Sequence, residues 1–226
     1  LLLDVAGEDE GVRGMDGAVA PLNAARDSSA LTLLRVNAAD GNQPLPSYVP
    51  VLRRQWTGVS HTRLHGEVRD LALAWNARAV VVDATGVGAG VASFLERALP
   101  GRVIPFTFSA ASKSKLGWDF LAIVDSGRWR EPLFDAERQP DQASAQQQFF
   151  EQLSACQHKV GQGPDQRISW GVPDGTRSTA SGELVHDDWI LSAALCAALE
   201  NLDWQPASPA LIVSAPDPLK GMEGHF

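Results

Sequence analysis

Hydrophobic and polar positions follow two patterns along this chain. Short runs rich in apolar and β-branched residues, bounded by Gly, Pro or Asp, predict strands. Longer stretches with apolar residues three and four positions apart predict helices. The predicted strands are 1–6, 30–37, 49–58, 77–84, 102–109 and 166–172, and the predicted helices are 61–77, 86–99, 113–129, 143–159 and 186–202.

The order of these elements predicts an α/β fold with one mixed sheet flanked by helices. The first three strands follow one another without a helix and suit an antiparallel meander, and a helical crossover then lets the fourth strand lie parallel beside the first. Residues 1–203 are expected to form one domain. Residues 204–226 are rich in Pro and Ser without periodicity, so this tail is expected to be extended or partly disordered.

Composition and length are those of an ordinary globular domain. The chain has 226 residues, of which 44% are hydrophobic and 20% charged, enough for one full core. No apolar run is long enough to span a bilayer, and Asp4 with Glu8 to Glu10 occupies the place of the basic region of a signal peptide. A start at Leu1, directly in a strand and without an initiator Met, suggests a piece of a longer protein. Cys156 and Cys196 lack CxxC spacing and are expected to be reduced core thiols of an intracellular protein.

The net charge of −8 argues against a generic nucleic-acid binder, which should be basic. A metal site concentrates negative charge, however, and a basic path can be local. Most of the positive charge is Arg, which suits bidentate phosphate contact, although scattered Arg is also typical of a solvated surface.

Three acidic positions stand out in the hydrophobic pattern. Asp4 and Asp83 end strand-like runs, and the pair Asp187–Asp188 opens an apolar helix. A buried carboxylate is costly unless something pairs with it. The carboxyl ends of the first and fourth strands would meet at one edge of the sheet, and a helix start favours carboxylates. An all-oxygen cluster there suits Mg²⁺ or Mn²⁺.

Each of these residues also has a structural explanation. Asp187 or Asp188 alone could be an N-cap, and Asp4 and Asp83 could be turn residues. Their joint occurrence favours a metal site, in which two cations about 3.5–4 Å apart would activate water and stabilise the leaving oxygen in phosphodiester cleavage. Asp4, on the central strand, would bridge the ions. Adjacent helical residues point about 100° apart, so Asp188 is expected to be the ligand and Asp187 a second ligand or cap.

Three further residues are candidates for supporting roles. His186 could be an outer metal ligand or a group behind the ligands, or a surface or capping residue. Lys113 and Lys115 begin a predicted helix, where the helix dipole does not favour them. They could contact phosphate, or be ordinary solvated lysines.

The glycine run after Asp83, DATGVGAG, does not match a dinucleotide-binding fingerprint. It gives GxGxG in place of GxGxxG, and the acidic residue precedes the glycines. A turn that lets the backbone pass close to the metal site explains these glycines as well. No Walker motif GxxxxGK[ST] is present, so this chain is not expected to hydrolyse ATP itself.

The Asp4 strand, VVVDATGVGAGVASFL, SKSKLGWDFLAIVDSGRW and HDDWILSAALCAAL together resemble the nuclease domain of tailed-bacteriophage large terminase subunits. The resemblance covers about residues 1–203. It implies an RNase H-like, RuvC-like fold and a Mg²⁺- or Mn²⁺-dependent endonuclease that cuts concatemeric double-stranded DNA, with Asp4, Asp83, Asp188 and the adjacent Asp187 as metal ligands.

The same resemblance implies a setting for the chain. Family members have a preceding ATPase domain, which this sequence lacks, and they work with a portal protein and a small terminase subunit during virus assembly in the host bacterial cytoplasm. One departure is the acidic loop after Asp4, with Glu8, Asp9, Glu10 and Asp16, which would repel DNA unless it moves aside or binds metal. The alternatives are a resolvase or transposase core of the same superfold, a nucleotide-cofactor-binding α/β domain, and a non-catalytic assembly module.

Overall fold

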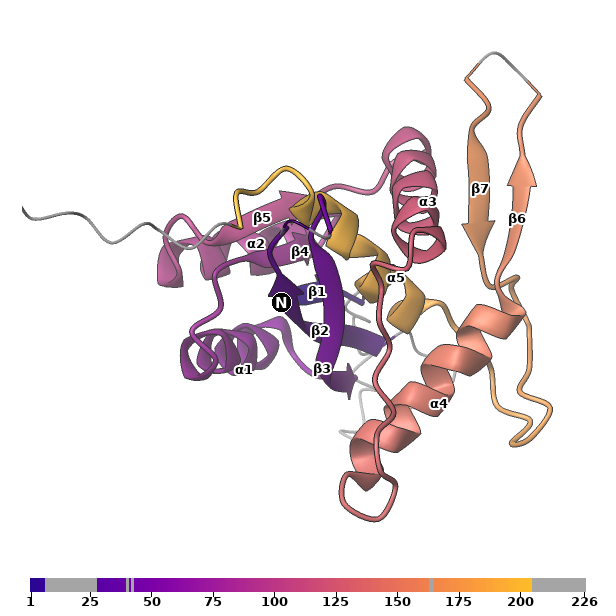
Figure 1. The fold of residues 1–226 in the computed structure, drawn as a ribbon. Helices are drawn as coiled ribbons and strands as arrows, with labels where there is room; N and C mark the ends of the chain where they lie inside the picture. Colours follow the sequence, from indigo (N-terminus) through magenta and orange to yellow (C-terminus); the bar gives the residue numbers. More distant parts are fainter. Residues whose placement is uncertain (7–27, 40, 42, 163–164, 205–226) are drawn as a thin grey trace, which may run out of the picture.

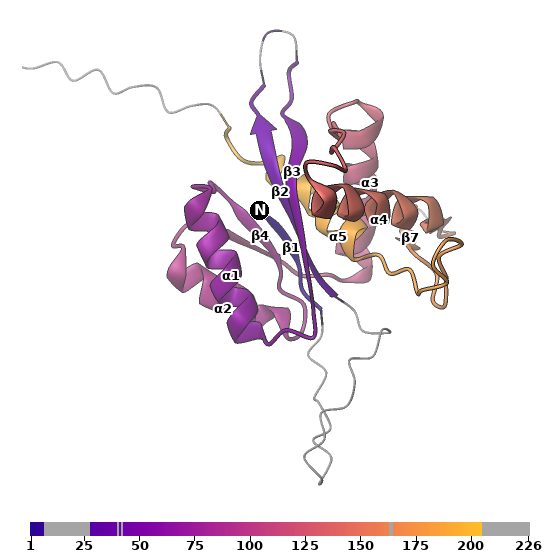
Figure 2. The ribbon, with the colours of Figure 1, turned by 90° about the horizontal axis from the view of Figure 1, so that it is seen from below.

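The computed structural model describes residues 1–6, 28–39, 41, 43–162 and 165–204. A five-stranded sheet in the order β3-β2-β1-β4-β5 forms the centre, with helices on both of its faces (Figures 1 and 2). The main sheet consists of β1 (Leu2–Asp4), β2 (Ser28–Asn37), β3 (Ser47–Thr57), β4 (Val80–Asp83) and β5 (Val103–Phe106). The helices are α1 (His61–Ala74), α2 (Gly88–Ala98), α3 (Ala110–Asp125), α4 (Pro140–Ala155) and α5 (Asp188–Ala194), which continues as the 3₁₀ helix η1 (Leu195–Leu199).

The strand pairing confirms the predicted mixed sheet. β2 pairs antiparallel with both β1 and β3, whereas β4 pairs parallel with β1 and β5. β1 lies between β2 and β4, and its three residues are all buried. Its register places Leu3 opposite Val82. The last residues of β1 and β4, Asp4 and Asp83, therefore reach the same edge of the sheet.

The core lies in two layers, one on each face of the sheet. Successive side chains of a strand point to opposite faces, so Leu2 packs in one cluster and Leu3 in the other. Figure 2 shows α1 and α2 on one face and α3, α4 and α5 on the other. Among the described residues, no helix is long and apolar enough to cross a membrane.

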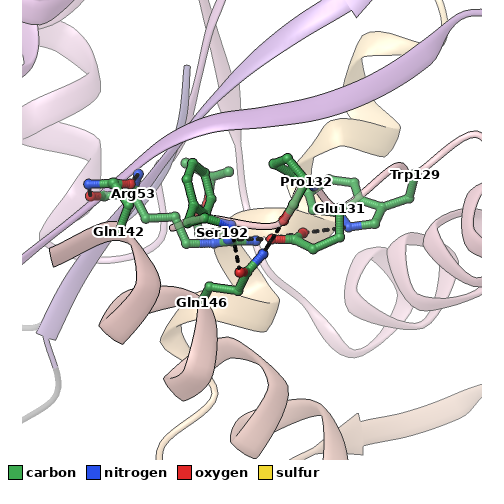
Figure 3. A network of polar contacts seen from close by, with 9 residues as sticks. Arg53, Trp129, Glu131, Pro132, Gln142, Gln146 and Ser192 are labelled. Atoms are coloured by element: carbon green, nitrogen blue, oxygen red, sulfur yellow. Dashed lines mark hydrogen bonds and ion pairs between the residues drawn. The ribbon is translucent and has the colours of Figure 1, made fainter. Parts of the chain in front are cut away.

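Helix α4 is anchored to strand β3 by a buried polar network (Figure 3). Arg53 forms two hydrogen bonds to Glu131, at 2.6 and 2.9 Å, and its guanidinium stacks over the Phe149 ring at 4.4 Å. Gln146 donates to Glu131 at 2.8 Å. Gln142 accepts from the backbone N–H of Arg53 and donates to its carbonyl, which extends the edge strand with a side-chain amide. The network fixes one face of α4 against the sheet.

The predicted helix over 143–159 is wrong in its limits. α4 starts at Pro140 and ends at Ala155, and Gln157–Val160 is a strand, β6, paired with β7 (Ile168–Gly171) in a separate two-stranded sheet. The buried residues of α4 are Gln146, Phe149 and Gln152, whereas the apolar Phe150 is 48% exposed. The glutamines can be buried because each finds hydrogen-bond partners there.

The C-terminal part of the described chain follows the predicted helix only in part. The regular α-helix starts at Asp188 and gives way to the 3₁₀ helix at Leu195. Cys196 is buried, as expected, whereas Cys156 is half-buried at the end of α4, and both are free thiols. Trp204 packs against the core and its ring N–H donates to the Leu199 carbonyl at 3.1 Å. The expected tail beyond it, and the acidic loop with Glu8, Asp9, Glu10 and Asp16, lie outside the described residues.

Candidate metal centre

Three carboxylates from distant parts of the chain are buried at the carboxyl edge of the sheet. Asp4 ends β1, Asp83 ends β4 and Asp188 begins α5, and they are 8%, 7% and 6% exposed. Burial raises the pKa of the Asp4 carboxyl well above its usual range, and the negative charges of Asp188, Asp83 and Asp187 raise it further. The carboxylates of Asp83, Asp187 and Asp188 therefore all lie within electrostatic reach of Asp4.

Asp188 is hydrogen-bonded to the antiparallel strands β2 and β3 of the sheet. Its Oδ2 accepts from the backbone N–H of Ser28 at 3.3 Å and from the side-chain amide of Gln55 at 3.4 Å. Ser28 begins β2, the antiparallel neighbour of β1, and Gln55 lies on β3. These bonds turn the carboxylate towards the sheet edge where Asp4 ends.

The turn after β4 positions Asp83. The backbone N–H of Thr85 donates to Asp83 Oδ1 at 2.8 Å. Burial raises the pKa of Asp83, and the hydrogen bonds from Thr85 oppose that rise. Gly88 lies so close to the carbonyl of Asp83 that a Cβ there would overlap it, and Gly86 has φ +54°. The glycines after Asp83 thus serve a tight turn, as the second interpretation of the run supposes.

Asp187 and Asp188 point to different partners. Asp187 Oδ2 lies 3.5 Å from the Lys113 ammonium group, which is also 5.4 Å from the centre of the Trp170 ring. Lys113 therefore belongs to the surroundings of the acidic cluster, and its charge lowers the pKa of Asp4 against the other influences. Lys115 pairs instead with Asp119 on the exposed side of α3.

A cleft of about 410 Å³ adjoins the cluster on the side of α4. It is lined by Asp188, His186, Gln55 and Gln152, together with Ser178, Glu183 and other residues of the segment before α5. His186 thus lines the same cleft as Asp188.

The donor set suits a hard divalent cation. All four groups offer carboxylate oxygen, which Mg²⁺ and Mn²⁺ prefer, and a cation would relieve the repulsion that raises the pKa of Asp4. Within the described parts of the chain, no three His, Cys, Asp or Glu side chains are already placed to hold one ion together. The carboxylates are gathered at one edge, and coordination would need side-chain adjustment.

The supporting residues Ser28, Gln55, Thr85 and Gln152 are not evident from the sequence. Thr85 could have been found, because a Thr two residues after an Asp is typical of a turn. Gln152 has a weak signal, since it lies three residues after Phe149 and so shares a helix face with it. Ser28 and Gln55 contact Asp188 across more than 130 positions of sequence, and no local pattern shows such a contact.

Comparisons with known proteins identify the family and the fold of the chain. The model of a family described as terminase RNase H-like domain matches residues 47–196, which is more than half of the chain. No curated protein sequence matches this chain. The large terminase nuclease of thermophilic phage G20c, solved with bound magnesium, is 16% identical and superposes with a TM-score of 0.53 over 76% of this chain and 74% of that one.

A second structure of the G20c nuclease is 15% identical, with a TM-score of 0.52 over 78% of this chain and 76% of that one. At these identities the likeness shows a shared fold. The family match extends from β3 into η1, and so includes Asp83, Asp187 and Asp188. By its sequence and its RNase H-like α/β architecture, the chain belongs to the terminase RNase H-like domain family.

Proposed function

We propose that this domain is a metal-dependent endonuclease of a viral DNA-packaging terminase, which cleaves concatemeric double-stranded DNA by hydrolysis of phosphodiester bonds. The observation that carries the proposal is the meeting of Asp4, Asp83 and Asp188 at one edge of the sheet in a member of this family. Asp4 is a buried carboxyl whose pKa is raised by burial and by three neighbouring carboxylates, which is unfavourable without a cation, and such perturbed groups are typical of functional sites.

The proposed ligands are Asp4, Asp83 and Asp188, with Asp187 beside them. Asp4 lies on the central strand and would bridge two divalent cations, Mg²⁺ or Mn²⁺. Thr85 holds Asp83, and Ser28 and Gln55 hold Asp188. When bound, the two ions would supply an activated water and stabilise the leaving oxygen.

The proposed path of the DNA backbone to the metal centre passes Lys113. An open cavity of about 550 Å³ next to Asp187 is lined by Lys113, His158, Lys159 and Trp170, among others. Lysines offer point charges for phosphate, and they stand out in a chain whose net charge is −8. Local positive charge at the cluster would offset the repulsion between an acidic protein and DNA.

The wider setting follows from the family resemblance. A preceding ATPase domain, a portal protein and a small terminase subunit are the proposed partners, in the host bacterial cytoplasm during virus assembly. The magnesium bound to the G20c nuclease is of the cation class proposed for this chain.

A plasmid-nicking assay with Mn²⁺ tests the proposal. Asp4→Asn, Asp83→Asn and Asp188→Asn each keep the size of the side chain and remove one charged ligand. Loss of an outer partner of a metal ligand typically costs about 10- to 100-fold in affinity or activity, and removal of a ligand itself should cost more. We expect cleavage to fall by more than about 100-fold in each variant.

Asp119→Asn is the matched control, because it removes an acidic residue of α3 that pairs with Lys115 away from the cluster. It should cut like the wild-type protein. Wild-type cutting by Asp4→Asn or Asp83→Asn, or equal cutting by the wild-type protein in excess EDTA, would reject the metal-dependent nuclease.

A further inference from the structure

We propose that Gln152 of α4 is a positioning residue for the metal centre, which caps the first turn of α5 so that Asp187 and Asp188 are free to face outward from it. The inference rests on the proposed function for the identity of the bound ion. The contacts that suggest it lie in the described structure and concern the start of one helix.

The first turn of a helix leaves backbone N–H groups without partners inside the helix. In α5 two of these groups are satisfied by a residue from another helix. The N–H of Trp189 donates to Gln152 Oε1 at 2.8 Å, and the N–H of Ile190 donates to the same oxygen at 3.3 Å. Gln152 is only 6% exposed. A buried side-chain amide thus takes the place of a local cap.

The residue that would normally do this is Asp187. It occupies the N-cap position of α5, and Asp is among the preferred N-cap residues because its carboxylate accepts from the second or third N–H. Those two groups belong to Trp189 and Ile190, the groups that Gln152 already satisfies. Asp187 makes no side-chain capping hydrogen bond, and its carboxylate turns to Lys113.

The choice between Gln152 and Asp187 as the capping residue also affects Asp188. If Asp187 swung back to cap the helix, the first turn would rotate, and Asp188 would leave the N–H of Ser28 and the amide of Gln55. Gln152 prevents this by filling the capping place first. It does so with a neutral oxygen, which adds no fifth negative charge to a cluster where Asp4 is already repelled by three carboxylates.

Helix α4, from which Gln152 reaches α5, is firmly attached to the sheet. Two turns earlier, Gln146 donates to Glu131, which holds the buried Arg53 of β3 (Figure 3). Gln142 binds the backbone of the same strand. Because α4 is tied to the sheet and capped onto α5, it links the edge strand β3 to the segment that carries Asp187 and Asp188. Sites held by such a rigid support keep their geometry.

The test compares Gln152→Leu with Gln148→Leu. Gln152→Leu keeps a side chain of comparable volume but offers no acceptor. Gln148 lies one turn earlier on the same helix and also touches α5, but through the ring N–H of Trp189, at 3.3 Å. Mn²⁺ affinity is measured by titration calorimetry without DNA, and hydrogen exchange of the Trp189 and Ile190 amides by NMR without metal.

We expect Gln152→Leu to weaken Mn²⁺ binding by about 10- to 100-fold, the usual effect of losing a group behind the ligands. The two amides should stay protected from exchange, because Asp187 takes over as their acceptor, while the resonance of the Lys113 ammonium group shifts as its partner leaves. Gln148→Leu should bind Mn²⁺ within about 2-fold of the wild-type affinity.

Gln152→Glu provides the rescue, since it restores an acceptor oxygen in the same place. Its extra charge attracts cations, so Mn²⁺ affinity should be at least that of the wild-type protein. Should Gln152→Leu not fold, Gln152→Asn replaces it: the amide remains, but its oxygen is drawn back by one methylene, and Mn²⁺ affinity should fall in the same direction.

Wild-type Mn²⁺ affinity in Gln152→Leu or Gln152→Asn, or a weakened affinity in Gln152→Glu, would overturn the positioning role. That result leaves the nuclease intact if Asp83→Asn still abolishes Mn²⁺ binding. If Asp83→Asn also binds Mn²⁺ normally, the proposed metal centre itself is wrong, and the two failures are told apart.

Discussion

At the residue scale, the two glycines at positions 88 and 90 show how closely the backbone approaches the acidic cluster. Both belong to the first turn of α2, with one residue between them. A Cβ at Gly88 would meet the carbonyl group of Asp83, whereas a Cβ at Gly90 would meet nothing within 4 Å. Only at Gly88 does the close packing exclude a side chain.

Gly88→Ala should destabilise the domain by about 1–3 kcal/mol, the usual cost of forcing extra volume into a packed place. It should also move Asp83 and so weaken Mn²⁺ binding. Gly90→Ala should instead stabilise the domain by up to about 1 kcal/mol, because Ala favours a helix more than Gly does. Urea unfolding of the two variants measures the difference, and equal stability would contradict the close approach at Gly88.

The sequence singles out the three carboxylates that the structure brings to one edge of the sheet, but it does not show the remote residues that hydrogen-bond around them. Asp4, Asp83 and Asp188 are each recognisable because they stand at the end of a hydrophobic run or the start of an apolar helix. Gln152 acts on backbone N–H groups that lie 37 positions further along the chain. A residue whose partners are backbone groups of a remote segment leaves no mark in the local pattern.

At the element scale, a buried ion pair joins Arg53 of the edge strand β3 to Glu131 of the segment before α4, and Gln146 of α4 donates to the same Glu131. The Arg53 side chain is 0% exposed and that of Glu131 is 13% exposed. Breaking a buried pair on one side leaves an uncompensated charge, which typically costs about 3–5 kcal/mol. α4 therefore depends on Glu131 more than its modest apolar face would suggest.

Glu131→Ala should lower the free energy of unfolding by about 3–5 kcal/mol. Replacing both partners, with Arg53→Met and Glu131→Leu, should recover most of that loss, because no charge is then left buried. Asp119→Ala, which breaks the exposed pair with Lys115, should change stability by less than about 1 kcal/mol. Urea unfolding tests all three, and a large effect of Asp119→Ala would contradict this ranking.

Element limits were predictable where the local pattern decides them and not where packing does. The strands of the main sheet and the helices α1 and α2 follow their hydrophobic periodicity. β6 does not, because all four of its residues are exposed, and it is a strand through its pairing with β7. β7 is itself docked on α3, where the Trp170 ring N–H donates to the Lys113 carbonyl at 2.7 Å.

At the scale of the whole molecule, the acidic cluster links stability to pH and to metal. Burial and three neighbouring charges raise the pKa of Asp4 in the folded protein above its ordinary value of 3.8. The folded state then binds this proton more tightly than the unfolded state does. Ionising Asp4 therefore costs stability, and stability falls as the pH rises from 3.8 through the raised pKa.

Asp4→Asn should consequently be more stable than the wild-type protein at neutral pH in EDTA, and the advantage should vanish below about pH 4, where Asp4 is protonated in both states. Mn²⁺ should raise the melting temperature of the wild-type protein and do so far less for Asp4→Asn. Thermal unfolding with and without Mn²⁺ at both pH values measures this. A variant less stable than wild type at neutral pH without metal would contradict the mutual repulsion.

The hydroxyl of Ser192 on α5 donates to the carbonyl of Leu2 on β1 across 190 positions of sequence, at 3.0 Å. The central strand thus receives one of its covering helices only after nearly the whole domain has left the ribosome. During synthesis, Asp4 and Asp83 emerge long before Asp188 can join them. A nascent chain that ends before α5 therefore has only two of the three buried carboxylates of the proposed metal centre, and it also lacks the helix that covers the central strand.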